Sequence, residues 1–164
     1  MSIIDGKMFH MNAELLTSNE LDPSPLRDTE LVQEIQFLTA RLAAKGNNHA
    51  NKLLEGLDLN VRQFSVLALA ASDLKPTQRE MSAFVALDPS QIVALVDTLE
   101  DRDLVKRETD RRDRRSKNIV ATDAGEKLYR KARAITITAE DHVLANLTEA
   151  ERDQLRELLT KATL

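Results

Sequence analysis

The chain has 164 residues, with 23 Lys and Arg against 27 Asp and Glu, and its formal net charge is −4. It contains no cysteine, which excludes disulfides and thiol-based redox sensing and leads us to expect a cytoplasmic protein. No stretch approaches the roughly 20 consecutive apolar residues of a membrane-spanning helix, and we expect no secretory signal. Aromatic residues make up 3% of the chain, which argues against binding single-stranded nucleic acid through stacked bases.

The first 25 residues show no hydrophobic periodicity, and Asp22-Pro23-Ser24-Pro25 marks the end of this segment. We therefore expect an N-terminal arm at residues 1–25. A helix is predicted to follow, because apolar residues recur at helical spacing at Leu31, Ile35, Leu38 and Leu42. This helix is expected to continue past Gly46 to Leu54.

Two helix-start signals come next. Asn60, with Gln63 at the third helical position, predicts the N-terminus of one helix. Thr77 and Glu80 form a capping box. It opens a short helix whose expected core residues are Met81, Phe84 and Val85.

The helix that begins at Asp88 is the most informative. Asp88 is predicted to cap it and Pro89 to occupy its first position. Its inward face is expected to consist of Ile92, Leu95, Val96 and Leu99.

A β-ribbon with a basic tip is predicted directly after this helix. Residues 104–107 and 118–121 are β-prone, and four arginines lie between them: Arg111, Arg112, Arg114 and Arg115. Residues 102–117 hold eight basic and four acidic residues, so this segment carries +4 and the remainder of the chain −8. A helix followed by a cationic ribbon is the form of a winged helix-turn-helix. Its helix enters the DNA major groove while the tip reaches phosphates or the minor groove.

Two further helices are predicted at the C-terminus. Thr122 begins a long helix that reaches about Asn146, and a capping box at residues 148–151 opens the last one. This last helix is expected to bury Leu155, Leu158 and Leu159. The flanking helices either enlarge one core or form a dimer interface. We favour the interface, because helix-turn-helix proteins usually bind two half-sites with two-fold symmetry.

Three motifs resemble the MarR family of bacterial transcriptional regulators, and the likeness covers roughly residues 30–160. The first is LDLNVRQFSVL at residues 57–67. The second joins DPS at 88–90 to LVDTLEDRDLV at 95–105. The third joins DRR at 113–115 to VATDAG at 120–125 and is the most specific of the three.

The resemblance implies a mainly α fold with a small β-ribbon and a homodimer that represses a promoter by binding a palindrome. A dimerisation helix at 26–56, a winged helix-turn-helix at 57–122 and further dimerisation helices at 123–164 follow from it. In the family a small molecule, often phenolic or otherwise anionic, commonly releases the DNA. The alternative is a winged-helix module that binds a protein partner and has no sequence-specific DNA binding.

The candidate DNA-binding residues are Thr77, Gln78, Ser90, Gln91, Ala94, Arg112, Arg114 and Arg115. Thr77 and Gln91 could equally act as helix caps. Asp97 and Asp113 are expected to brace wing arginines. Where the family often shows Thr-Arg, this helix has Val93-Ala94, and it carries no basic residue between positions 88 and 101. We therefore expect affinity to depend mainly on the wing.

Residue patterns for catalysis are not found, and neither a cofactor nor a metal is expected. His10, His49 and His142 are scattered singly, outside any metal-binding spacing. The resemblance places an effector pocket between the dimer helices and the helix-turn-helix. Its candidate lining residues are Arg41, His49, Arg62 and Phe64, with Phe37, Leu38 and Leu67 as a possible apolar wall.

Overall fold

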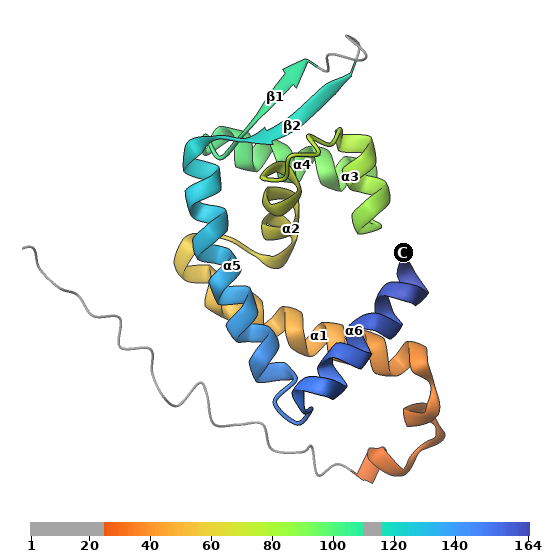
Figure 1. Cartoon of the computed structure of the whole chain (residues 1–164). Coiled ribbons are helices and arrows are strands. Elements are labelled where there is room, and N and C mark those ends of the chain that lie inside the picture. The colour runs from red at the N-terminus through yellow and green to blue at the C-terminus, as the bar shows by residue number, and fades with distance from the viewer. Residues whose placement is uncertain (1–24, 110–115) are drawn as a thin grey trace, which may run out of the picture.

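The computed structural model describes residues 25–109 and 116–164. Within them the chain is mainly helical with a small antiparallel ribbon, as predicted (Figure 1). The elements in chain order are three short 3-10 helices interspersed with six α-helices and two strands: η2 (Pro25–Asp28), η3 (Glu30–Gln33), α1 (Ile35–Leu54), η4 (Glu55–Leu57), α2 (Val61–Ala70), α3 (Gln78–Val85), α4 (Pro89–Asp101), β1 (Val105–Thr109), β2 (Lys117–Ala121), α5 (Asp123–Val143) and α6 (Glu149–Thr163).

The predicted helix starts are confirmed by their capping hydrogen bonds. Complete capping boxes open four helices, at Asn60, Thr77, Asp88 and Thr148. Thr122 caps α5, accepting a hydrogen bond from the backbone of Gly125 at 3.0 Å. These side chains satisfy backbone N–H groups that have no partner within the helix, so they fix where each helix begins.

One hydrophobic core lies beneath α2, α3 and α4 and extends to the ribbon. Its fully buried side chains include Leu54, Val66, Leu67, Met81, Ile92, Val96, Leu99, Val105 and Ile119. The turn between α3 and α4 has Ala86 in the left-handed region at φ 52°. Ser82 donates a hydrogen bond to the carbonyl of Leu87 at 2.7 Å across this turn. This core holds α4 by one face.

The ribbon pairs β1 with β2 in antiparallel register, from Val105 opposite Ala121 to Thr109 opposite Lys117. It projects beyond the helix-turn-helix at the end of the molecule far from α6 (Figure 1). A bridge from Thr77 to Asn118 and a hydrogen bond from Ile119 N to Pro76 O at 2.8 Å attach β2 to the start of α3. The ribbon is therefore joined to the helix that precedes the turn.

The long helices α1 and α5 pack against each other, and α5 runs from the ribbon to the opposite end of the molecule, where the chain turns into α6 (Figure 1). Helix α1 continues through Gly46 to Leu54, as expected, but Leu31 lies outside it in η3. Glu34, with extended backbone angles, separates the two helices.

Two burial predictions are wrong. Phe84 is 63% exposed, because Met81, Ser82 and Val85 form the inward face of the two-turn helix α3 and leave Phe84 outside it. In α6, Leu158 and Leu159 are 57% and 36% exposed and Leu155 is half-buried. Helix α6 has an apolar face, but the rest of this single chain covers it only in part.

Among the residues that the structure describes, no single helix is long and apolar enough to cross a bilayer. Only the pair α3 and α4 passes by length and composition, and these two helices are bent by 117° relative to each other.

Candidate nucleic-acid interface and effector pocket

Helix α4 has one buried and one exposed face, and its position next to the ribbon makes it the candidate recognition helix. Ile92, Val96 and Leu99 are fully buried, whereas Ser90, Gln91, Val93, Ala94, Asp97 and Thr98 are exposed. The exposed residues begin at the helix N-terminus, where recognition helices contact base edges.

The first turn of α4 is ordered by Asp88. Its carboxylate accepts hydrogen bonds from the backbone N–H of Ser90 at 2.8 Å and from the Ser90 hydroxyl at 2.5 Å. Both bonds favour the charged form and hold the pKa of Asp88 below its usual value. Gln91 accepts a bond from the Asp88 backbone N–H at 3.3 Å. Ser90 and Gln91 therefore take part in capping, while their side chains stay exposed on the surface of α4.

Asp97 contacts the ribbon through Arg107, a β1 residue that sequence reasoning did not select. The Arg107 guanidinium donates to the carboxylates of both Asp97 and Glu100, and its backbone N–H donates to Glu100 at 3.1 Å. Burial disfavours the charge on Arg107, but these bonds and charges outweigh it, so the pKa of Arg107 is raised. The sequence held one indication of this role for Arg107: side chains alternate along a strand, so residues 105 and 107 lie on the same side of β1.

Thr77 and Gln78 lie at the start of α3, beside β2. Thr77 is occupied by capping, since its hydroxyl and backbone N–H both donate to Glu80, at 2.8 and 2.7 Å. The amide nitrogen of Gln78 is buried and has no hydrogen-bond partner among the described residues. Arg112, Asp113, Arg114 and Arg115 lie outside the described residues.

Arg102 has a structural role. In the sequence it counts among the basic residues of segment 102–117, but its side chain is bonded within the fold. Its guanidinium donates to the carbonyl oxygens of Asp58 at 2.6 Å and Leu57 at 3.2 Å. Asp58 has φ 51° at the end of η4. Arg102 thus ties the C-terminus of α4 to the segment between α1 and α2.

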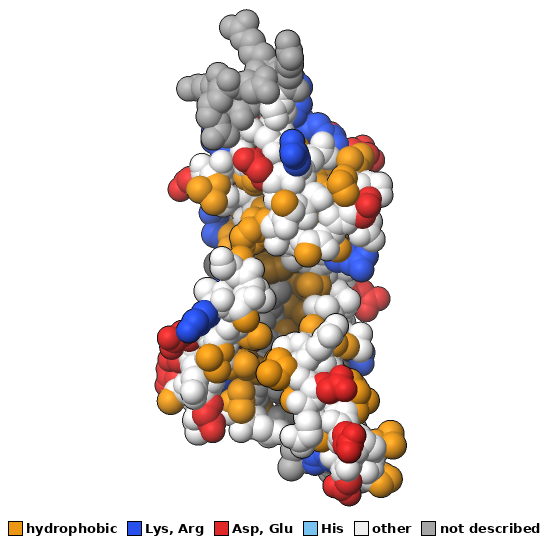
Figure 2. Space-filling model, turned by 90° about the vertical axis from the view of Figure 1, so that its right-hand side faces the viewer, with side chains coloured by type: hydrophobic (Ala, Val, Ile, Leu, Met, Phe, Trp, Pro, Cys, Tyr) orange, Lys and Arg blue, Asp and Glu red, His pale blue; other side chains and the backbone are white. Residues whose placement is uncertain are grey.

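A cavity of about 490 Å³ lies between α1, α2, α5 and α6. In Figure 2 it opens as a hollow between the helix-turn-helix and the α1–α6 end, with hydrophobic side chains on its rim. Apolar lining is supplied mainly by Leu42, Ala50, Val61, Phe64, Val143 and Leu155. The volume falls within the range of about 300–1,000 Å³ typical of small-molecule sites.

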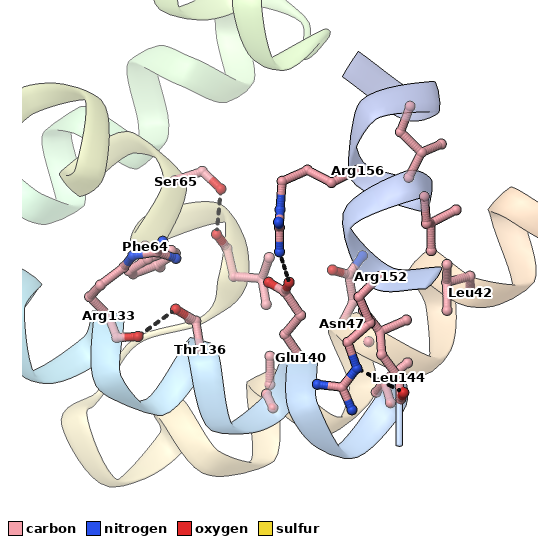
Figure 3. Close-up of a pocket in the computed structure, with 17 residues that line it drawn as sticks. Leu42, Asn47, Phe64, Ser65, Arg133, Thr136, Glu140, Leu144, Arg152 and Arg156 are labelled. Carbon is pink, nitrogen blue, oxygen red and sulfur yellow. Dashed lines mark hydrogen bonds and ion pairs between the residues drawn. The ribbon is translucent and has the colours of Figure 1, made fainter. Parts of the chain in front are cut away.

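Three arginines line this cavity, and they differ in their contacts (Figure 3). Arg152 donates to the carbonyls of Leu144 and Leu147 at 3.2 and 3.3 Å and to Asp141 at 2.7 Å, so it secures the α5–α6 turn. Arg156 lies 3.8 Å from Glu140 across the cavity and 2.6 Å from Asp153. Arg133 is exposed, and its guanidinium has no ion pair within the described residues. Arg133 is therefore the guanidinium group on this cavity that has capacity for an anion, since Arg152 and Arg156 each have a carboxylate partner.

Of the predicted effector residues, only Phe64 lines the cavity, whereas Arg41, His49 and Arg62 do not. Arg41 and Arg62 are exposed on other faces of their helices. His49 stacks instead on His142, with ring centroids 4.1 Å apart. Burial, His142 and Lys52 lower the pKa of His49. The cavity residues Arg133, Arg152 and Arg156 were not selected from the sequence. The one indication in the sequence was the four-residue spacing of 152 and 156, which places both on one face of a helix.

These features define a winged-helix protein: a helix-turn-helix, a β-ribbon, and the ion pairs of Arg107 that join the ribbon to α4. Residues 59–117 match the model of the MarR family. The chain is 31% identical over 109 residues to the HTH-type transcriptional regulator BilQ of Clostridium symbiosum, covering 65% of this chain and 73% of BilQ.

Two solved structures extend the comparison. CouR from Rhodococcus jostii RHA1, bound to p-coumaroyl-CoA, is 38% identical with a TM-score of 0.74, and the match covers 82% of this chain and 94% of CouR. MepR of S. aureus, in a DNA complex, is 26% identical with a TM-score of 0.66, over 79% of this chain and 96% of MepR. The chain belongs to the MarR family of transcriptional regulators.

Proposed function

We propose that the protein is a homodimeric repressor that binds an inverted-repeat operator and releases it when an organic anion occupies the cavity. The observation that carries this proposal is the exposed face of α4 beside the ribbon, in a chain similar to the DNA-bound MepR. Asp97 and Glu100 hold the ribbon against this helix through Arg107. Both elements would then contact one DNA duplex.

Dimerisation is supported by apolar side chains at the two ends of the described chain. Of the eleven exposed large hydrophobic residues in the described part, seven lie at 26–38 and 158–164: Leu26, Leu31, Ile35, Leu38, Leu158, Leu159 and Leu164. Exposed apolar side chains gathered in these two segments favour a partner, and a second copy suits two-fold DNA. In this proposal residues 26–56 and 123–164 form the dimer base, and residues 57–122 bind DNA.

The effector we propose is an organic anion with an aromatic body, of the class that includes aromatic acids and their CoA thioesters. The apolar wall containing Phe64 suits an aromatic ring, and Arg133, which has no ion pair within the described residues, suits negative charge. The likeness to CouR, solved with p-coumaroyl-CoA, supports this class. Regulation through binding, without catalysis, is the activity we propose, because the matched curated relative is a transcriptional regulator.

The test is selection of fragments from the encoding genome by the purified protein at physiological salt. Enrichment of a short inverted repeat is expected, and p-coumaroyl-CoA is then titrated against the complex alongside p-coumarate and free CoA. Release by the aromatic probes, weakened in Arg133→Gln but retained in Arg62→Gln outside the cavity, would support the effector site. Failure to enrich any DNA would contradict the repressor proposal and favour a winged helix that binds a protein partner.

A further inference from the structure

The polar side chains on the exposed face of α4 are already hydrogen-bonded within the protein. The Ser90 hydroxyl donates to the Asp88 carboxylate at 2.5 Å, and the side-chain amide oxygen of Gln91 accepts from the Asp88 backbone N–H at 3.3 Å. Thr98 donates its hydroxyl to the carbonyl of Ala94 at 2.8 Å, and Asp97 accepts from Arg107. Much of the hydrogen-bonding capacity of this face is therefore already used within the protein.

An apolar strip lies among these groups. Val93 is 43% exposed and Ala94 is also exposed, one position further along the helix. Thr98 follows Ala94 by one turn, so the two side chains are neighbours on the helix surface. Because the Thr98 hydroxyl is committed to the backbone, its methyl group is the part that remains for contact. We call Val93, Ala94 and the Thr98 methyl the apolar strip; Ala94 and Thr98 are neighbours, and Val93 lies at its edge, since successive helix residues point about 100° apart.

The DNA major groove carries one apolar group that distinguishes a base, the C5-methyl of thymine. Alanine and threonine methyl groups contact it in DNA complexes, and valine has the same chemistry. A strip of three methyl-bearing side chains on the groove-facing side of a helix without basic residues matches this group better than it matches a guanine edge. We propose that this recognition helix identifies thymine through its C5-methyl group, with Val93 as the principal contact.

This inference rests on the proposed DNA-binding function, and it specifies how the operator sequence is recognised. It places specificity in hydrophobic contact with the major groove. Affinity then comes from charge elsewhere, since the strip itself neutralises no phosphate. The operator is accordingly expected to contain at least one essential thymine in each half-site.

The test replaces each thymine of the selected inverted repeat in turn with deoxyuridine, which lacks the methyl group and keeps every hydrogen-bonding atom. Binding of wild-type protein is followed by fluorescence anisotropy. We expect one or two positions in each half-site at which the replacement weakens binding about fourfold, the equivalent of losing one buried methyl group. The minor groove is unchanged by this replacement, so contacts made there do not contribute.

Val93→Ala provides the matching change on the protein. Its sensitivity to deoxyuridine at those positions should fall below about twofold, because one partner of the contact is already reduced. Phe84→Ala, another exposed apolar side chain but on α3, is the control and should keep the full sensitivity. Binding of the repeat without any sensitive thymine, or unchanged sensitivity in Val93→Ala, would overturn the inference and leave the repressor function intact. Absence of DNA binding would overturn both.

Discussion

Substituting Gly125 tests how the ribbon is joined to α5. A Cβ at Gly125 would lie 1.9 Å from the carbonyl oxygen of Leu104 and 2.9 Å from its carbonyl carbon. Both are backbone atoms, and the same carbonyl accepts a hydrogen bond from Thr122 N at 3.1 Å. The Thr122 hydroxyl also donates to Asp103 O at 2.6 Å. Gly125→Ala must therefore displace α5 from the turn that links α4 to β1.

The expected loss in the free energy of unfolding is about 3 kcal/mol. Overpacking costs about 1–3 kcal/mol, and a clash with backbone belongs at the upper end. Loss of the Thr122–Leu104 hydrogen bond adds about 1 kcal/mol, while the better helix propensity of alanine recovers about 1 kcal/mol.

The assay is urea unfolding followed by circular dichroism at one fixed protein concentration, because dimerisation makes apparent stability depend on concentration. Gly46→Ala is the control. A Cβ at Gly46 meets nothing within 4 Å, so this variant should gain up to about 1 kcal/mol from helix propensity. A Gly125→Ala protein within about 0.5 kcal/mol of wild type would mean that this junction accommodates a Cβ without displacing α5.

Three further predictions concern charged side chains. Arg102→Gln should lower the free energy of unfolding by about 2 kcal/mol, because two carbonyls lose a charged donor; an unchanged urea midpoint would contradict this. Arg107→Gln should weaken DNA binding about tenfold, since it frees the ribbon and leaves Asp97 unneutralised near phosphates; equal affinity in anisotropy titrations would argue against it. The pKa of His49 is lowered from 6.5, so the unfolded state binds its proton more readily than the folded state does. Stability should therefore be complete above about pH 6.5 and fall below it, with a smaller fall in His142→Asn; parallel pH profiles would count against this coupling.

Local chemistry made much of the fold predictable. Four helix starts could be predicted because an N-cap side chain accepts a hydrogen bond from a backbone N–H of the first turn, only two or three residues away in sequence. These N-caps are Asn60, Thr77, Asp88 and Thr148. Helix α4 and the ribbon could be predicted from similarly local patterns. The exposure of Phe84 could not be predicted in this way. In a helix of two turns the sequence allows more than one set of buried residues, and only the packing of α3 against α2 and α4 selects one of them.

The cavity and the histidine pair could not be predicted from the sequence. Residues 49 and 142 are distant in sequence, and only the packing of α1 on α5 brings their rings to 4.1 Å. Arg133 and Arg156 come from different helices, α5 and α6, and line one cavity only because the turn that Arg152 secures folds α6 back toward α5. The partial exposure of Leu158 and Leu159 also depends on a partner surface, which an amphipathic pattern indicates but does not identify.

In the function proposed above, two copies of this chain bind two half-sites on one face of a duplex. The most direct measurement is an anisotropy titration on the selected inverted repeat and on the same repeat with about five base pairs, half a helical turn, inserted between its half-sites. The insertion turns the second half-site to the opposite face, so we predict that affinity falls to that of unrelated DNA of equal length. Equal affinity for the two duplexes would contradict the account.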